Sequence, residues 1–314
     1  MLARPFLFAS DKPIMDHEDR PFESERATLY VVATPIGNLR DVTLRALDVL
    51  KSVDCVAAED TRVSSGLLRR YGITTKLISI HEHNERSQSE RVTAMLGDGQ
   101  SVALISDAGT PSVSDPGAVV VAAVRGAGYS VVPIPGPSAL ATLLSVTGWP
   151  ATPFTFVGFL PAKKGARREV LAAMAGSHPA MVFYEAPHRI VEMLQDVAAT
   201  FDGGRRITVG RELTKRFESI HESTLAEIVE WIQADSDRQR GEFSLIVEGA
   251  PPQRDASGLT PGDVRMLERL MRELPASRAA RVAADLSGKP RSQFYRLALE
   301  RSGNDGDDVE PEEA

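Results

Sequence analysis

Short apolar runs alternate with longer segments of mixed polarity in the first half of the chain. The runs are rich in β-branched residues and have the length of buried strands, whereas the segments between them have the length of helices. The runs lie at residues 29–33, 53–58, 76–80, 102–105 and 130–134. Alternation of this kind predicts a parallel sheet with helices over its faces.

The second half of the chain contains four further strand-like runs, at residues 154–159, 180–184, 206–210 and 243–248. Helical patterns near residues 190–200 and 225–232 separate them, which predicts a second α/β domain with a mixed sheet. The stretch 147–153 between the halves is rich in turn residues and has little periodicity. We therefore place a domain boundary there.

Helical patterns alone follow a Pro-containing linker at residues 251–258. The pattern at 276–288 ends in Gly288, and the basic segment 289–292 opens a second helix. A helix, a tight turn and a second helix give the helix-turn-helix shape of many nucleic-acid-binding proteins. The pattern is equally typical of a helical hairpin that packs its apolar side chains on the preceding domains. Those side chains are Leu286, Phe294, Leu297 and Leu299.

These patterns divide the 314 residues into five segments. The segments are an N-terminal extension (1–27), an N-terminal α/β domain (28–146), a C-terminal α/β domain (147–250), a helical module (260–302) and an acidic tail (303–314). The net charge is −7, but the tail holds six acidic residues and no basic one, so the remainder carries only −1. We expect both ends to be disordered, and the near-neutral remainder can still hold basic patches.

Composition narrows the class of protein further. No apolar run reaches the roughly 20 residues that cross a bilayer, and the N-terminal segment lacks the apolar core of a signal peptide. We therefore expect a soluble, cytoplasmic protein. The single cysteine, Cys55, excludes an internal disulfide and a thiolate zinc cage, and its apolar surroundings predict a core residue.

The segment most informative about function is 107–117, Asp-Ala-Gly-Thr-Pro-Ser-Val-Ser-Asp-Pro-Gly. It follows the strand-like run 102–105, so its small and polar residues lie where open α/β sheets bind ligands. Residues 34–41 and 135–139 follow two other runs in the same way, with Asp41 or Ser138 placed to cap the next helix. A single turn of this kind is usually only a connection. Three in close succession predict a pocket.

Six motifs together resemble the tetrapyrrole-methylase family of S-adenosylmethionine-dependent enzymes. The motifs span residues 33–39, 58–62, 106–117, 135–139, 183–189 and 211–215. Their sequences and order are similar to the branch of the family that methylates RNA, over about residues 28–300. The first loop has Thr34-Pro-Ile where the branch that modifies tetrapyrroles has glycines. That difference argues against a porphyrinoid substrate.

The resemblance implies a cofactor, a reaction and partners. The cofactor would be S-adenosyl-L-methionine, bound between the two α/β domains, and the reaction would be 2′-O-methylation of a cytidine in the decoding centre of 16S ribosomal RNA. The partners would be that RNA in the small ribosomal subunit and a second copy of the chain, with no membrane. The implied cofactor contacts are Pro35, Ile36, Gly37, Gly109, Thr110, Val113, Ser138, Ala139, Glu185 and Glu212.

Methyl transfer from a sulfonium depends mainly on positioning, which can supply roughly 7–11 kcal/mol of a barrier. A ribose hydroxyl is a poor nucleophile near neutral pH, so a general base or a polarising cation would help. The candidates are Asp107, Glu59, Asp60, Glu185 and Lys215. Charged side chains beside turns are more often caps or ion pairs, and Asp60 with Arg62 or Glu185 with Arg189 can equally be structural pairs. The sequence leaves the base unassigned.

A dense basic cluster follows the first strand-like run of the second half. It consists of Lys163, Lys164, Arg167 and Arg168. Cations at a helix N-terminus oppose the helix dipole, so their retention there favours binding to RNA phosphates. A solvated helix start is the alternative.

The segment His81-Glu-His83 has the spacing of metal ligands at first sight. No third ligand follows at a recognisable spacing, and Asn84 looks like the start of a helix, so we expect no metal. The resemblance implies instead that this segment lies near the cleft.

Two other functions stay open. A tetrapyrrole C-methyltransferase would share the cofactor, although the first loop and the basic cluster speak against it. A non-catalytic protein would use only the helical end on nucleic acid, and binding of the cofactor would exclude it.

Overall fold

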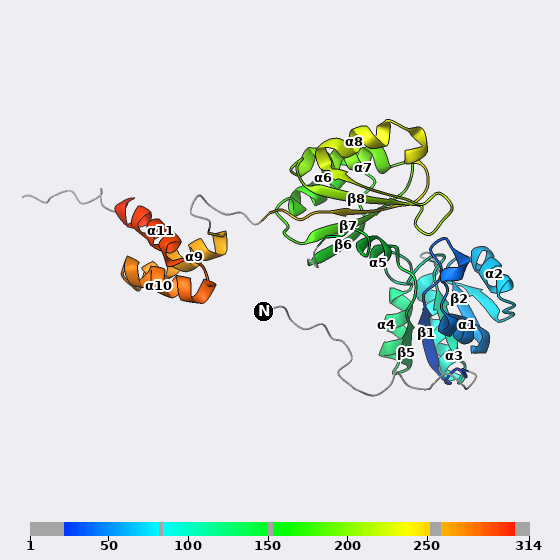
Figure 1. The fold of residues 1–314 in the computed structure, drawn as a ribbon. Helices are drawn as coiled ribbons and strands as arrows, with labels where there is room; N and C mark the ends of the chain where they lie inside the picture. The colour runs from blue at the N-terminus through cyan, green and yellow to red at the C-terminus, as the bar shows by residue number, and fades with distance from the viewer. Residues whose placement is uncertain (1–21, 82–83, 150–152, 252–258, 305–314) are drawn as a thin grey trace, which may run out of the picture.

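The computed structural model describes residues 22–81, 84–149, 153–251 and 259–304. Within these residues the chain forms two five-stranded sheets with helices, followed by a group of C-terminal helices (Figure 1). The α/β fold class predicted from the sequence is confirmed. Most of the predicted N-terminal extension, linker and acidic tail lie outside the described residues.

The first sheet is entirely parallel and has the strand order β3-β2-β4-β1-β5. Its strands are β1 (Thr28–Val32), β2 (Cys55–Ala58), β3 (Lys76–Ser79), β4 (Val102–Ile105) and β5 (Ser130–Ile134). The helices between and after them are η1 (Leu39–Asp41), α1 (Leu44–Ser52), α2 (Thr61–Arg70), α3 (Glu85–Gly97), α4 (Ala118–Gly126) and α5 (Ala139–Leu144). All five strands predicted for this half are present.

Successive residues of these strands face opposite sides of the sheet, so the apolar runs fill two cores. Tyr30 packs in the cluster that contains Ala46 and Leu50 of α1, whereas Leu29 packs with Val92 of α3 and Val120 of α4. Continuous apolar sequence is therefore what a strand covered on both faces requires. Cys55 is buried in the second of these cores, as predicted.

The caps of two helices differ in part from the sequence-based expectation. Asp41 does not cap α1, because it is the last residue of η1, and the side chain of Thr43 accepts the hydrogen bond from Ala46 N–H instead. Ser138 does occupy the N-cap position of α5, but its side chain makes no capping hydrogen bond. The Ser138 hydroxyl is thus not committed to the helix.

The second sheet is mixed and has the order β6-β7-β10-β8-β9, with β6 and β7 parallel and the other neighbours antiparallel. Its strands are β6 (Phe154–Phe159), β7 (Ala180–Glu185), β8 (Arg206–Arg211), β9 (Ser219–Thr224) and β10 (Phe243–Val247). Its helices are α6 (Lys164–Met174), α7 (Ile190–Thr200), α8 (Leu225–Gln233) and η2 (Ser236–Gln239). Strand β9 was not predicted, because it lies at the edge of the sheet and most of its side chains are polar.

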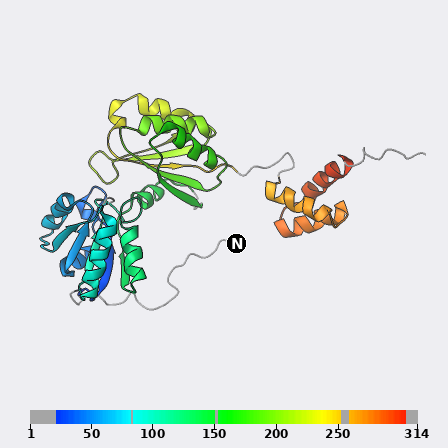
Figure 2. The ribbon, with the colours of Figure 1, turned by 180° about the vertical axis from the view of Figure 1, so that it is seen from behind.

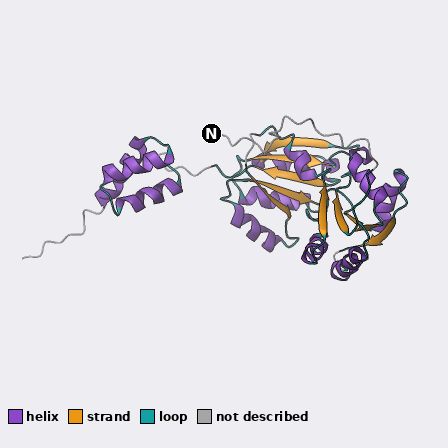
Figure 3. Ribbon diagram, turned by 90° about the horizontal axis from the view of Figure 1, so that it is seen from below, coloured by secondary structure: helices purple, strands orange, loops and turns teal. Residues whose placement is uncertain are grey.

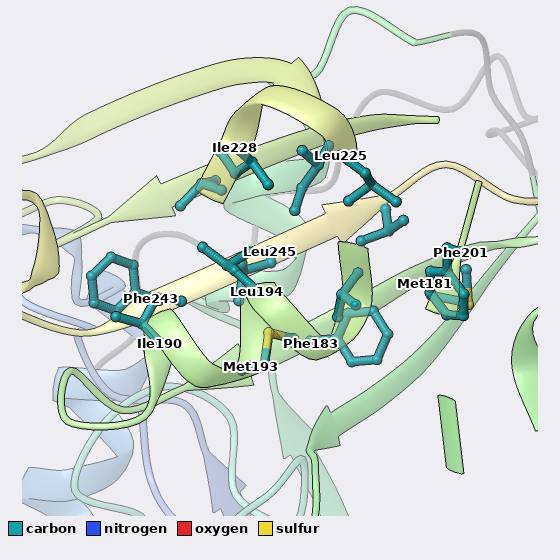
Figure 4. Packing of buried hydrophobic residues seen from close by; sticks show 14 of the residues in the cluster. Met181, Phe183, Ile190, Met193, Leu194, Phe201, Leu225, Ile228, Phe243 and Leu245 are labelled. Atoms are coloured by element: carbon teal, nitrogen blue, oxygen red, sulfur yellow. The ribbon is translucent and has the colours of Figure 1, made fainter. Parts of the chain in front are cut away.

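One face of the second sheet carries its main core. Phe183 of β7 and Leu245 of β10 pack against Ile190 and Leu194 of α7, and Ile228 of α8 joins the same cluster (Figure 4). These apolar residues recur at helical spacing on α7 and α8, so each helix buries one stripe.

The opposite face of the second sheet contacts the first half of the chain through α5 (Figures 1 and 2). Leu143 of α5 packs with Val182 of β7 and Ile246 of β10. A Cβ atom at Gly210 of β8 would come within 2.8 Å of Leu143, so glycine permits the close approach. This contact holds the two sheets next to each other at the site described below.

The C-terminal helices are α9 (Pro261–Met271), α10 (Ala276–Ser287) and α11 (Arg291–Asn304) (Figure 3). Gly288 ends α10 with φ +69°, as the sequence predicts. Phe294 and Leu297 are buried in a cluster drawn from the helical module itself, whereas Leu286 and Leu299 are 69% and 51% exposed. The alternative in which these four side chains pack on the preceding domains is therefore wrong.

Among the described residues, no helix combines the length and the apolar character that crossing a membrane requires.

Candidate active site

Three loops meet at the carboxyl edge of the first sheet. They leave β4, β1 and β5, which are neighbours in that order. The N–H of Thr34 donates to the carbonyl of Gly109 at 2.8 Å, and the N–H of Gly109 donates back to Thr34 at 3.0 Å. The hydroxyl of Thr110 donates to the carbonyl of Pro137 in the third loop at 3.3 Å. The predicted convergence of the three motifs is thus present.

The loop after β4 has an unusual backbone. Ser112 and Ser114 have φ values of +68° and +114°, in addition to Gly109 at +78° and Gly117 at +136°. Serine pays an energetic cost in this region, and such residues cluster at functional sites. A Cβ atom at Gly117 would come within 2.8 Å of the Ser112 hydroxyl oxygen, so the folded loop needs glycine there. The strain marks this loop as part of a ligand site.

A cavity of about 450 Å³ lies between these loops and the second sheet, within the range of roughly 300–1,000 Å³ typical of small-molecule sites. From the first half it is lined by Ile36, Ala108, Gly109, Thr110, Val113, Ser114, Asp115, Ser138 and Ala139. From the second half it is lined by Phe159, Tyr184, Glu185, Ala186, Pro187, Leu213, Glu242, Phe243 and Ser244. Both halves of the chain therefore build one site.

Glu185, at the end of β7, places a buried carboxyl group in the cavity wall. One oxygen, Oε1, accepts the N–H of Ala186 at 2.9 Å, and Oε2 lies 3.3 Å from Arg189 Nη2. Burial raises the pKa of Glu185, and the neighbouring arginine only partly offsets this effect. No group among the described residues donates a hydrogen bond to Oε2. This oxygen can therefore accept a hydrogen bond from a ligand.

Ser244 of β10 lies beside Tyr184 in the sheet register, and its buried hydroxyl also has no hydrogen-bond partner within the described part of the chain. Buried polar groups are normally satisfied, so each exception requires an explanation. Since Ser244 and Glu185 both line the cavity, a ligand with polar groups would satisfy them.

Seven of the ten predicted cofactor contacts line the cavity: Ile36, Gly109, Thr110, Val113, Ser138, Ala139 and Glu185. Pro35 does not, because it is buried. Gly37 lies beneath the Lys215 side chain, with which a Cβ atom there would collide. Glu212 is held by the N–H of Glu242 and by Lys215. As contacts of a cofactor, all ten stay predictions.

Sequence reasoning missed several lining residues. They are Asp115, Phe159, Tyr184, Pro187, Leu213, Glu242, Phe243 and Ser244. Asp115, Tyr184, Pro187 and Leu213 lie within the recognised motifs, but the motifs do not show which of their side chains face the site. Phe159, Glu242, Phe243 and Ser244 lie outside the motifs, and nothing in their local sequence shows that they face the first half of the chain. Only the packing of α5 on the second sheet brings them to the site.

Asp115 is the acidic residue that the strained loop places in the cavity. Burial raises its pKa, a hydrogen bond from Ser106 opposes the shift, and the negative charge of Asp107 adds to it. Tyr184 next to it has a pKa raised by burial, and its oxygen accepts the N–H of Leu140 at 3.0 Å. Tyr184 thereby ties α5 to the second sheet and stays a neutral phenol.

A second cavity, of about 470 Å³, lies beside the start of α2 and is lined by Glu59, Asp60, Thr61, Arg62, Ser79, His81 and Asp107. The N–H of Asp60 donates to Asp107 Oδ1 at 3.0 Å, and the N–H of Asp107 donates to Glu59 Oε2 at 3.4 Å. Burial raises the pKa of Glu59. Three of the five candidate bases therefore lie together. Asp107 lines this second cavity, and Ala108, the next residue, lines the first one.

Asp60 and Lys215 make the ion pairs expected of structural groups. Hydrogen bonds from Arg62 lower the pKa of Asp60 to about 2, and Asp60 also caps α2 through Arg62 N–H. Lys215 Nζ binds Glu212 at 3.0 Å and Glu242 at 2.9 Å. Burial lowers the pKa of Lys215, but these two carboxylates outweigh it and raise the pKa, which disfavours a role as a base.

The predicted RNA-binding cluster divides in the structure. Arg167 is 1% exposed and bonds Asp196 at 2.7 Å, so it stabilises the second half and has no surface for a phosphate, contrary to prediction. Arg168 also pairs with Asp196, at 2.7 Å, but remains half exposed. Lys163 and Lys164 are exposed at the start of α6. For these three the prediction stands untested.

His81 lines the second cavity, whereas Glu82 and His83 lie outside the described residues. In the parts of the chain that the structure describes, no group of three or more His, Cys, Asp or Glu side chains is placed to hold a metal ion. Asn84 occupies the N-cap position of α3, as its sequence context predicts.

The two sheets and the cavity between them define an α/β protein of the methylase type. The chain belongs to the family of tetrapyrrole (corrin/porphyrin) methylases, whose model matches residues 28–229. A second model, described as the RsmI C-terminal HTH domain, matches residues 260–302.

Two similar proteins carry the name ribosomal RNA small subunit methyltransferase I. The one from Escherichia coli O157:H7 is 43% identical, over 90% of this chain and 98% of its own length. The one from Xylella fastidiosa (strain Temecula1) is 48% identical, over 87% and 99%. The fold is also that of a Thermus thermophilus uroporphyrin-III C-methyltransferase solved with S-adenosylhomocysteine, with 17% identity, a TM-score of 0.51 and coverage of 70% and 97%.

Proposed function

We propose that the protein transfers a methyl group from S-adenosyl-L-methionine to the 2′-hydroxyl of a cytidine in the decoding centre of 16S ribosomal RNA. The observation that carries the proposal is the cavity that the three loop motifs and the second sheet build together. The similar proteins named ribosomal RNA small subunit methyltransferase I support the choice of RNA.

The cavity suits the cofactor chemically. S-adenosylmethionine combines an apolar, planar purine with hydroxyl, amino and carboxylate groups. The walls offer the apolar side chains of Ile36, Val113 and Leu213, and the unsatisfied oxygens of Glu185 and Ser244 offer polar partners. Within this proposal, those residues would hold the cofactor.

When bound, the cofactor would supply an electrophilic methyl group. The protein would orient the ribose hydroxyl and take up its proton. Asp115 and Glu185 both face the cavity, and the raised pKa of each makes its carboxylate a better proton acceptor. We leave the base open between them and the carboxylates of the second cavity.

RNA binding would rely on local positive charge. The helical module, residues 260–302, contains nine Lys and Arg residues against five Asp and Glu residues, in a chain whose net charge is −7. Lys163, Lys164 and Arg168 add exposed cations on the second half. Cationic surfaces of this kind bind phosphates regardless of sequence.

We further propose the organisation that the sequence suggests: α/β domains at 28–146 and 147–250, a helical module at 260–302, and terminal extensions at 1–27 and 303–314. The protein would work as a cytoplasmic homodimer on the small ribosomal subunit, without a membrane partner.

The decisive experiment is mass mapping of ribosomal RNA from cells with and without this protein. Loss of one 2′-O-methyl group from a decoding-centre cytidine, restored by the wild-type gene, is the expected result. Unchanged RNA would contradict the proposal. Transfer of label from S-adenosylmethionine to precorrin-type substrates would support the tetrapyrrole alternative, and absence of cofactor binding would support a non-catalytic protein.

Deleting residues 261–314 tests the helical module. We expect unchanged cofactor affinity, because every cavity-lining residue precedes Gly249, and weaker methylation of ribosomal subunits. Calorimetry and a methyl-transfer assay measure the two quantities. Equal methylation by the truncated and full-length proteins would remove the module from RNA binding.

A further inference from the structure

We propose that the turn between β8 and β9 is a stacking platform for an unpaired RNA base next to the acceptor nucleotide, with Phe217 as the stacking surface and Arg216 as a phosphate contact. The inference rests on the proposed function, since it requires an RNA substrate. It adds a binding site outside the cofactor motifs.

Phe217 is unusually open for an aromatic residue. Its exposed fraction is 63%, compared with 53% for Phe159 and 47% for Phe154, the other exposed aromatic residues described in the second half. The guanidinium carbon of Arg216 lies 5.5 Å from the centre of its ring. No carboxylate among the described residues pairs with Arg216. The exposed ring of Phe217 can stack on a base, and the Arg216 guanidinium can bind a phosphate of the same strand.

The turn that presents these side chains is firmly held. Glu212 and Thr214 have φ values of +52° and +67°. The N–H of Lys215 donates to the carbonyl of Glu212 at 3.0 Å, and the N–H of Glu218 donates to Lys215 at 3.2 Å. A rigid aromatic surface loses little conformational entropy when a partner binds.

The turn also lies at the rim of the cavity. Leu213, four residues before Phe217, lines the cavity, and so does Glu242, which pairs with Lys215. The Lys215 side chain packs against Gly37 in the first loop, so the turn reaches from the second sheet to the first half of the chain. A nucleotide flanking one whose ribose enters the cavity would pass this point.

Base stacking fits the surface better than the main rival, a second copy of the chain. Bases stack on aromatic rings in a sequence-tolerant way, with cationic side chains on the backbone. Arg40, three residues beyond Gly37 along the chain, is a further exposed cation. A protein interface would also use Ile220 of the edge strand β9, which is 44% exposed. Oligomeric state therefore separates the two partners.

The test compares Phe217→Leu, which keeps an apolar side chain without a ring, with Phe217→Trp, which keeps the ring. Phe154→Leu is the matched control, because Phe154 is a 47% exposed ring at the opposite end of β6 from the cavity. The probes are small ribosomal subunits from cells lacking this protein and a single-stranded oligoribonucleotide containing 2-aminopurine. The measurements are binding affinity, quenching of the fluorescent base, methyl transfer and sedimentation.

We expect Phe217→Leu to weaken binding of the subunits by roughly tenfold and to abolish quenching, while Phe217→Trp and Phe154→Leu keep the wild-type affinity. Cofactor affinity, thermal midpoint and sedimentation should not change. Wild-type affinity of Phe217→Leu for the subunits would overturn the stacking platform and leave the proposed function intact. A change in sedimentation would overturn it by showing that Phe217 contacts a second copy of the chain. A wild-type protein that neither binds nor methylates the subunits overturns the proposed function as well.

Discussion

Arg167 and Asp196 form a buried ion pair between α6 and α7. Their nearest side-chain atoms, Nη2 and Oδ2, lie 2.7 Å apart, and the two side chains are 1% and 2% exposed. Nε of Arg167 donates to the same oxygen at 2.7 Å, and Arg168 binds the other oxygen. A cation that the sequence places in an RNA-binding cluster thus joins two helices of the second half.

We expect Arg167→Ala to lower the free energy of unfolding by roughly 3–5 kcal/mol, because it leaves Asp196 buried with one partner fewer. The half-exposed Arg168 provides the control, and Arg168→Ala should cost about 1 kcal/mol or less. Denaturant unfolding of the two variants measures the difference. Equal losses would show that burial of Arg167 is not what matters.

The exposed pair Lys163 and Lys164 should behave differently. If both contact phosphates, replacing both by Ala should reduce the slope of log affinity against log salt by about 1.4 on single-stranded RNA, from roughly 0.7 per phosphate. Stability and cofactor affinity should stay unchanged. Titrations at several salt concentrations give the slopes, with Lys51→Ala, an exposed lysine of α1, as control. Parallel slopes would mean that the two lysines are only a solvated helix start.

Much of the fold could be predicted because its signals are local. The alternating apolar runs determine β1 to β5, and Gly288 ends α10 through its left-handed backbone. The edge strand β9 escaped prediction because its side chains are polar, and its pairing with β8 depends on a partner distant from its own sequence pattern. The burial of Arg167 could not be predicted either, because its partner Asp196 lies on another helix.

The part of the candidate site that belongs to the first sheet could be predicted from the sequence. Its three loops end neighbouring strands, and their glycines and prolines are visible in the sequence. Of the second wall only Glu185 was predicted, because Tyr184 and Ser244 become neighbours only through the register of β7 and β10. That wall faces the loops because α5 packs on the second sheet. The pattern of apolar residues within one helix or strand does not predict a contact between two distant elements.

Gly109→Val should abolish cofactor binding while the protein stays folded. Gly109 has φ +78°, which a β-branched residue adopts only with strain. A Cβ atom at this position would lie 3.4 Å from Ile36 in the cavity wall. Gly99→Val is a matched control, because Gly99 has φ +79° and open space around it. Calorimetry with S-adenosylmethionine should show binding to the control variant only. Full affinity in Gly109→Val would remove this loop from the site.

The last prediction concerns Asp115, whose pKa is raised above the ordinary value of an aspartate by burial and, further, by the negative charge of Asp107. A carboxyl group with a higher pKa in the folded state binds more protons when folded, so its contribution to stability falls as pH rises through that interval. At neutral pH the charged group destabilises the fold. Asp115→Asn should therefore raise the thermal midpoint at pH 7, and the gain should shrink towards zero near pH 3, where both states of the wild type are protonated.

The same substitution should lower methyl transfer if the carboxylate serves the reaction, since a residue kept at a cost in stability usually has a function. Thermal melting at the two pH values and a methyl-transfer assay at pH 7 test both parts. Asp107→Asn is the companion variant, because removing its charge should lower the pKa of Asp115 without removing the Asp115 carboxyl group. If Asp115→Asn is both more stable and fully active, Asp115 has no role in the chemistry, and the base must be sought at Glu185 or in the second cavity.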